Sequence, residues 1–200
     1  MHKNRQLFIA IGLTLLAIAF ITALGPAEKT LGTNVRVVYL HGAWVWAALC
    51  AFFGAGAVGA AGLVSGRETI NKWSRALGRT GLLFWITYLP LSMWAMQTNW
   101  NGLFLAEPRW RMAIIFAVCG LLIQIGITLL EDPIWASAAN LVYLIALGFA
   151  VYNVQDVMHP SSPIMDSDAA SIQIFFFGLL LLALLLVGLI AKVFRNVEDH

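Results

Sequence analysis

The sequence predicts an all-α, polytopic membrane protein that crosses the bilayer six times. Of its 200 residues, 60% are hydrophobic and only 11% are charged, and the mean hydropathy is +0.83. These values lie far from the balance of an ordinary soluble domain. The chain also holds six apolar runs near the roughly 20 residues that a helix needs to cross the hydrocarbon core. We therefore expect a single membrane domain over residues 1–200, without a soluble part.

The apolar runs give the expected bounds of the helices. The first run follows the polar stretch MHKNRQ and is longer than the apolar core of a signal peptide, so we expect a retained transmembrane helix. The third run is the shortest, and Pro90 is expected to kink it. Pro133 is expected to begin the fifth helix after a tight turn at EDP. In chain order, the helices are expected at residues 7–24, 37–64, 82–96, 112–130, 134–152 and 169–191.

Two further patterns concern how these helices pack and begin. The second run contains FFGAGAVGAAGLVSG, in which glycine and alanine recur at the spacing that lets helices approach closely. The acidic stretch Asp166–Asp168 precedes the sixth run. Because carboxylates accept hydrogen bonds from the free N–H groups of a helix start, we expect this stretch to cap the sixth helix.

The basic residues between the apolar runs predict the orientation. If the amino terminus is cytoplasmic, eight lysines and arginines lie on the inner side and four on the outer side. The stretch SGRETINKWSRALGRT, expected as an inner loop, contributes four of the eight. Because cytoplasmic loops are enriched in lysine and arginine, we expect both termini in the cytoplasm and the protein in the plasma membrane of a prokaryote.

Several classes of function find no support in the sequence. The net charge is only +2, and the basic residues are scattered instead of forming one face, so nucleic acid is not an expected partner. The two cysteines form no CxxC or CxxCH motif, which argues against a zinc site and against covalently attached heme. No nucleophile with a base, P-loop or dinucleotide fingerprint is visible, so we do not expect an enzyme.

Two histidines are the main candidate site residues. His41 lies within the second apolar run, where an imidazole is costly unless something binds it. His159 lies in the loop between the fifth and sixth helices, and the predicted orientation places both residues on the outer side. Two neutral imidazoles without cysteine or carboxylate neighbours suit axial ligation of a heme iron. The alternative is two unrelated interfacial histidines, each hydrogen-bonded locally, and the residues alone leave both interpretations open.

An aromatic segment with arginines follows the third helix on the same side. Aromatic rings suit the apolar face of a porphyrin, and arginines suit its propionates. The alternative is an interfacial aromatic belt whose arginines extend to lipid phosphates. The residues concerned are Trp94, Trp100, Phe104, Trp110, Arg109 and Arg111.

Three short motifs give the chain a resemblance to a known family. Tyr39, His41 and Trp46 are similar to an outer Y-x-H motif followed by tryptophan; WNGLFLAEPR can be laid without a gap on WGTWWVWDAR; and His159 stands ahead of the sixth helix. With these motifs and its six-helix topology, the chain resembles the cytochrome c assembly family, and within it the heme exporter C proteins. Trp100, Glu107 and Arg109 match the second motif in kind. The departures are Ala43 in place of a frequent proline, Leu103, Phe104 and Ala106 in place of inner tryptophans, and the absence of a tryptophan pair before His159.

The resemblance implies a heme b at the outer leaflet, with His41 and His159 as axial ligands. It also implies that the aromatic residues Trp46, Trp100 and Phe104 contact the heme and that Arg109 lies near a propionate. The implied function is heme handling for cytochrome c maturation, with other membrane subunits and an outer heme chaperone or cytochrome as partners; an ATP-binding partner is expected from the resemblance alone. One alternative is a membrane b-type cytochrome that relays electrons between quinol and an outer redox partner, which would suit the missing tryptophans. Another is a structural anchor subunit without a cofactor.

Overall fold

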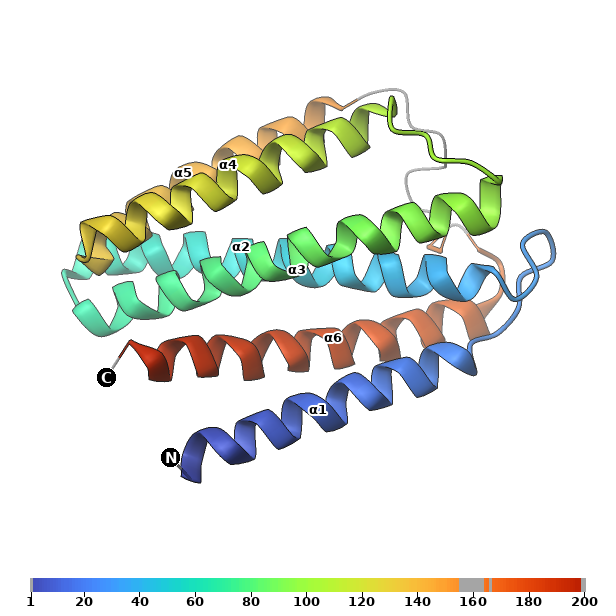
Figure 1. Ribbon diagram of the computed structural model, residues 1–200, viewed down its shortest axis with the longest axis horizontal. Coiled ribbons are helices and arrows are strands. Elements are labelled where there is room, and N and C mark those ends of the chain that lie inside the picture. The colour runs from blue at the N-terminus through green and yellow to red at the C-terminus, as the bar shows by residue number, and fades with distance from the viewer. Residues whose placement is uncertain (1, 155–163, 166, 199–200) are drawn as a thin grey trace.

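The computed structural model in Figure 1 describes residues 2–154, 164–165 and 167–198 of the chain. Most of these residues are helical, as predicted. The helices are α1 (His2–Ala23), α2 (Val35–Ser65), α3 (Glu68–Trp100), α4 (Pro108–Leu130), α5 (Pro133–Asn153) and α6 (Ala170–Val197). Five of these six helices, all except α3, are long and apolar enough to cross a membrane. The prediction of six helices in a membrane protein is therefore confirmed to that extent.

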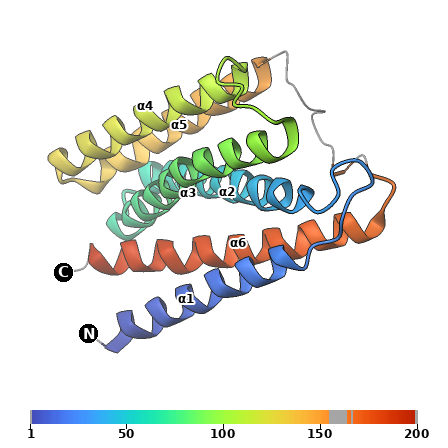
Figure 2. The ribbon, with the colours of Figure 1, turned by 45° about the vertical axis from the view of Figure 1, so that its right-hand side comes forward.

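The helices form one elongated bundle with two distinct ends. Figure 1 shows both termini at one end, together with the short turns that join α2 to α3 and α4 to α5; we call it the terminal end. The opposite end, which carries residues 24–34 and 101–107, is the loop end. α1 lies beside α6 on one side of the bundle, α4 and α5 lie on the other side, and α2 and α3 lie between them (Figures 1 and 2).

The third helix differs most from its predicted bounds. It was expected at residues 82–96, after a loop at residues 65–80, but α3 begins at Glu68 and ends at Trp100. That prediction was wrong because it relied on continuous apolar runs, whereas the first half of α3 is polar. The helix also continues through Pro90. Because α3 packs against α2, α4, α5 and α6, it lies with α2 at the center of the bundle, and its polar first half lies among these neighbours.

The other helices begin and end within a few residues of the expected positions, and local chemistry explains several of their ends. Gly66, with φ +65°, closes α2 and donates its backbone N–H to Gly62 O over 2.9 Å. Pro133 begins α5, as predicted, and the Asp132 carboxylate accepts a hydrogen bond from Ile134 N (2.9 Å). The expected acidic cap of α6 is wrong as far as the described residues show, because the N-cap residue is Ala169, which makes no side-chain cap bond.

A buried polar network joins α2, α3 and α5 in the half of the bundle near the terminal end. Asn140 Nδ2 donates to Ser74 O (2.8 Å) and Ser74 Oγ (3.1 Å), and Ser74 Oγ donates to Ala55 O (2.8 Å). Ser137 Oγ donates to Asn71 Oδ1 (2.7 Å). The two pairs lie three residues apart on both α3 and α5, so they occupy one face of each helix. Hydrogen bonds of this kind hold helices together where the surroundings are apolar.

Small residues of α2 allow the close approach of α5, as the glycine and alanine spacing predicted. A Cβ atom added to Gly56 would lie 2.5 Å from Leu144 Cδ2 of α5. A Cβ atom added to Gly59 would lie 2.8 Å from Ser137 O, which belongs to the α5 backbone. At Gly59 the contact is with backbone that cannot rotate away, whereas at Gly56 the Leu144 side chain would have to shift.

A cluster of charged residues joins α3, α4 and the end of α6 at the terminal end. Glu198 Oε1 lies 3.0 Å from Arg79 Nη1 and 3.4 Å from Arg75 Nε, and its side chain is 7% exposed. Arg75 also donates from Nη2 to Ile127 O (3.1 Å) and from Nη1 to Glu131 O (3.3 Å). These two carbonyls belong to the end of α4 and the residue after it, where helix carbonyls lack partners within the helix. Arg75 therefore connects three parts of the chain.

The connection from α1 to α2 at the loop end has a defined structure of its own. The Glu28 carboxylate accepts hydrogen bonds from Thr30 N (2.7 Å) and Leu31 N (2.9 Å). These backbone N–H groups, Leu31 first and Thr30 second, hold the pKa of Glu28 below its usual value. Arg36 Nε donates to Gly25 O over 2.8 Å. The guanidinium of Arg36 thus helps to hold this connection against the start of α2.

Candidate functional site

His41 lies on α2, near the loop end and close to α3. It lies six positions after Val35, the first residue of α2, which places it about 9 Å along the helix axis. The side chain is half-buried. Its ring lies against the ring of Tyr88 on α3, with centroids 5.5 Å apart and planes inclined by 50°. One wall of the environment of His41 is therefore an aromatic ring of α3.

Tyr88 is itself held in place by a second aromatic residue. Trp85 lies one turn earlier on the same face of α3, and its ring meets that of Tyr88 edge-on at 5.0 Å. Trp85 Nε1 donates to Ala113 O of α4 over 2.9 Å. Both aromatic side chains are buried. The ring that supports His41 is thus fixed to α4 through Trp85, and sequence patterns alone did not indicate this role for Tyr88.

The face of α2 that carries His41 meets α5 only farther toward the terminal end. Phe52 lies eleven residues after His41, which returns the helix to within about 20° of the same direction. Its ring packs against Tyr143 of α5 with centroids 4.8 Å apart. Toward the loop end, α5 diverges from α2 in both views (Figures 1 and 2). At the level of His41, α5 therefore lies apart from this face of α2.

The last turns of α5 are correspondingly exposed. None of residues 148–153, all of which the structure describes, is buried. Phe149 is 72% exposed and Tyr152 is 89% exposed. Apolar side chains near the loop end are thus available to lipid or to a bound apolar molecule.

Trp46 does not lie on the same face of α2 as His41. The two residues are five positions apart, which corresponds to a rotation of about 140° around the helix. The side chain of Trp46 is 55% exposed. A different tryptophan, Trp44, packs on Phe84 of α3 at 4.7 Å and donates to Thr87 Oγ1 over 2.9 Å. The motif that includes Trp46 therefore does not bring that ring toward the imidazole.

The remaining predicted residues of the aromatic segment lie at the loop end. Trp100 is the last residue of α3, Phe104 lies half-buried in the loop that follows, and Arg109 is the second residue of α4. The end of α3 is tied to the start of α2, because Asn34 Nδ2 donates to Thr98 O over 3.1 Å. Trp100 and His41 thus lie on two helices that are joined at this end.

Glu107, which the sequence left without a clear structural role, caps α4. Its Oε2 atom accepts a hydrogen bond from Trp110 N over 2.8 Å. Pro108 follows at the first helical position, where its missing N–H costs nothing. The pattern of an acidic residue before proline is a helix-start signal that sequence reasoning could have used.

We expect Glu107→Ala to lower the free energy of unfolding by about 1 kcal/mol, the usual cost of losing a helix N-cap. Glu107→Gln keeps an oxygen acceptor at the same position and should retain most of the stability. Thermal unfolding of the two variants in detergent, followed by circular dichroism, measures the difference. Equal midpoints for the alanine variant and the unchanged protein would contradict the capping role.

His159, the second predicted ligand, lies outside the described residues. The described chain resumes at Ile164, whose Cδ1 would lie 3.8 Å from a Cβ atom added to Gly42. Gly42 is the residue after His41 and also packs close to Phe176 of α6. Ile164 therefore lies beside the residue that follows the candidate ligand on α2.

The described residues contain no group of three or more histidine, cysteine, aspartate or glutamate side chains that could hold a metal ion. A site built from protein ligands alone therefore finds no support in the described part of the chain. A heme iron takes four of its ligands from the porphyrin and needs only one or two axial side chains from the protein. A single half-buried imidazole such as that of His41 can be one of them.

Fold and composition together define the chain as an all-helical membrane protein, with five apolar helices long enough to cross a membrane. No protein-family model matches the chain, and no curated protein matches it.

Proposed function

We propose that this protein binds heme b at the loop end and handles it for cytochrome c maturation. His41 and His159 ligate the iron in this proposal, and the heme is cargo that the protein holds and passes on. The proposal rests chiefly on one observation, the position of Ile164 beside Gly42. Ile164 lies five residues after His159, and five residues of extended chain span at most about 18 Å. This limit allows His159 to approach the part of α2 that carries His41.

The surroundings of His41 support the proposal in a second way. An axial imidazole needs a fixed orientation, which neighbouring groups commonly provide. Tyr88 supplies a buried ring against the imidazole, and Trp85 anchors that ring to α4. The exposed apolar end of α5 adds surface near the loop end that a porphyrin could cover.

Other residues of the loop end are assigned roles by their chemistry. Trp100 and Phe104 provide aromatic surface for the porphyrin ring, and Arg109 provides a cation for a propionate. Trp46 faces another direction from His41 and is exposed, so we leave it out of the proposed contacts. No bond in the heme changes, and the protein is not an enzyme in this proposal.

The proposed topology has six crossings, with both termini in the cytoplasm and the loop end outside. The excess of basic residues toward the terminal end supports this orientation. The protein then lies in the plasma membrane of a prokaryote. Its partners are other membrane subunits of a heme-handling or respiratory complex, and an outer heme chaperone or cytochrome that receives the heme.

A membrane b-type cytochrome is the second candidate function. It is favoured by the residues at positions 103, 104 and 106, where leucine, phenylalanine and alanine replace the tryptophans that the resemblance would predict. Leu103 is 47% exposed. A surface without these tryptophans suits a heme that stays in the protein and exchanges electrons with a quinol and an outer partner.

An absorption spectrum of the purified protein tests both functions. We expect a Soret band and the spectrum of a low-spin heme in the unchanged protein, and we expect His41→Ala to abolish or shift it. His2→Ala changes a histidine at the terminal end and serves as the matched control, with an unchanged spectrum. Redox titration with and without a quinol then separates the candidates, because rapid quinol reduction of a tightly held heme favours the cytochrome.

Two outcomes would count against these proposals. No Soret band in the unchanged protein would remove both heme functions and favour a structural anchor subunit. A heme spectrum that neither His41→Ala nor His159→Ala alters would refute the assignment of the ligands.

A further inference from the structure

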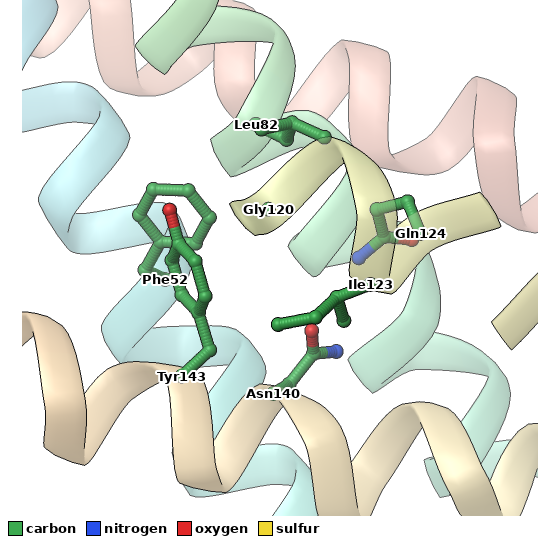
Figure 3. Close-up of a pocket in the computed structure, with 7 residues that line it drawn as sticks. All are labelled: Phe52, Leu82, Gly120, Ile123, Gln124, Asn140 and Tyr143. Atoms are coloured by element: carbon green, nitrogen blue, oxygen red, sulfur yellow. The ribbon is translucent and has the colours of Figure 1, made fainter. Parts of the chain in front are cut away.

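A small cavity lies between α2, α3, α4 and α5, toward the terminal end. Its volume is about 10 Å³, and its walls include Phe52, Leu82, Ile123, Gln124, Asn140 and Tyr143 (Figure 3). Most of these side chains are apolar, but two carry amide groups. Gln124 extends from α4 and Asn140 from α5, and Figure 3 shows the amide nitrogen of Gln124 on the side toward Asn140 and its oxygen on the other side.

The hydrogen bonds around the cavity leave two amide oxygens without a donor. Asn140 Nδ2 donates to Ser74 O and Ser74 Oγ, and the Tyr143 hydroxyl donates to Phe116 O over 2.8 Å. Gln124 Oε1 is buried and has no hydrogen-bond partner among the described residues. No described residue donates to Asn140 Oδ1 either. The two amide groups form no direct hydrogen bond with each other, so a gap separates them.

We infer that this cavity binds one water molecule that bridges Gln124 and Asn140. A volume of about 10 Å³ is close to the smallest that holds a single water, and larger ligands do not fit. Water can accept a hydrogen bond from the Gln124 amide N–H and donate one to Asn140 Oδ1, which lacks a donor among the described residues. An amide oxygen left unsatisfied among apolar helices is costly, so a donor to Asn140 Oδ1 is favoured. The chemistry of the cavity therefore selects water.

The bound water would connect α4 to the polar network of α3 and α5. Asn140 already reaches Ser74, and Ser74 reaches Ala55 of α2. With the water in place, a chain of hydrogen bonds extends from α4 to α2 through the center of the bundle. This inference is independent of heme binding, because the cavity and the network lie away from His41.

Nuclear magnetic resonance of the full chain in detergent, labelled with ¹⁵N-asparagine, tests the inference. We expect magnetisation transfer from water to the side-chain amide of Asn140, whose signal is identified by its loss in Asn140→Ser. Gln124→Met keeps the length of the side chain without its amide and should weaken the transfer at least about fivefold, because the water loses a partner. Gln97→Met, the same substitution at an exposed position near the loop end, is the matched control and should leave it unchanged.

The absence of transfer in the unchanged protein would overturn the inference, as would undiminished transfer in Gln124→Met. The measurement on the unchanged protein decides the question even if Gln124→Met fails to fold. Size-exclusion chromatography and the helical circular dichroism signal show whether that variant is folded.

Discussion

Arg75→Met is expected to lower the free energy of unfolding by about 3 to 5 kcal/mol, the cost of removing one partner of a buried ion pair. Methionine has a similar length and retains the packing of the side-chain stem, so the loss reports on the guanidinium. Without it, Glu198 keeps the ion pair with Arg79 and the weaker electrostatic attraction of Arg195 and Lys72. The carbonyls of Ile127 and Glu131 also lose their donor. α3, α4 and the end of α6 should therefore separate together.

Chemical unfolding in detergent, followed by circular dichroism, measures this loss. Arg67→Met is the matched control, because Arg67 is an exposed arginine just before α3, and its replacement should change stability by less than about 0.5 kcal/mol. The double variant with Glu198→Gln should lose less than the sum of the two single losses, since both remove the same interaction. Additive losses would show that Arg75 acts without Glu198.

Gly59→Ala is expected to lower the free energy of unfolding by about 1 to 3 kcal/mol through overpacking. The added Cβ atom would lie 2.8 Å from Ser137 O, 2.9 Å from Ser74 Oγ and 3.2 Å from Ser137 Cα. Two of these atoms belong to the backbone of α5, so rotation of a side chain cannot relieve the contact. α5 has to move away from α2, which also strains the hydrogen bonds between Asn140 and Ser74.

Gly188→Ala on α6 is the matched control for this change. An added Cβ atom at Gly188 has no other atom within 4 Å, apart from its own local helix backbone. Since alanine favours a helix over glycine by about 0.5 to 1 kcal/mol, this variant should be as stable as the unchanged protein or slightly more so. Thermal midpoints of the two variants in the same detergent make the comparison. Similar midpoints for both would contradict the close packing of α2 and α5.

The apolar runs predicted five of the helices well because those helices expose long apolar surfaces. The bounds of α3 were not predicted correctly, because its first half buries polar side chains against its neighbours. Whether Asn71 and Ser74 face solvent or another helix depends on how α2 and α5 pack against α3. The sequence of α3 alone does not determine that packing. The same applies to Arg75, which the sequence presented as one basic residue of a loop.

Sequence reasoning located His41 but could not describe its surroundings. The ring of Tyr88 and its anchor Trp85 come from a helix that starts far along the chain from His41, and their spacing on α3 is that of ordinary core residues. Trp46 is near His41 in sequence but turns away from it, because five residues along a helix do not share a face. The pairing of His41 with His159 stays a prediction.

The composition of α3 has a consequence for the biogenesis of this protein. It lies at the center of the bundle with α2, yet its polar first half leaves it less apolar along its length than the five helices that are long and apolar enough to cross a membrane. We therefore expect a nascent α3 to insert most readily as a hairpin with the preceding α2, to which a short turn at Gly66 joins it. Substitutions that weaken the association of this pair should then reduce the yield of correctly inserted chains as well as the stability of finished ones.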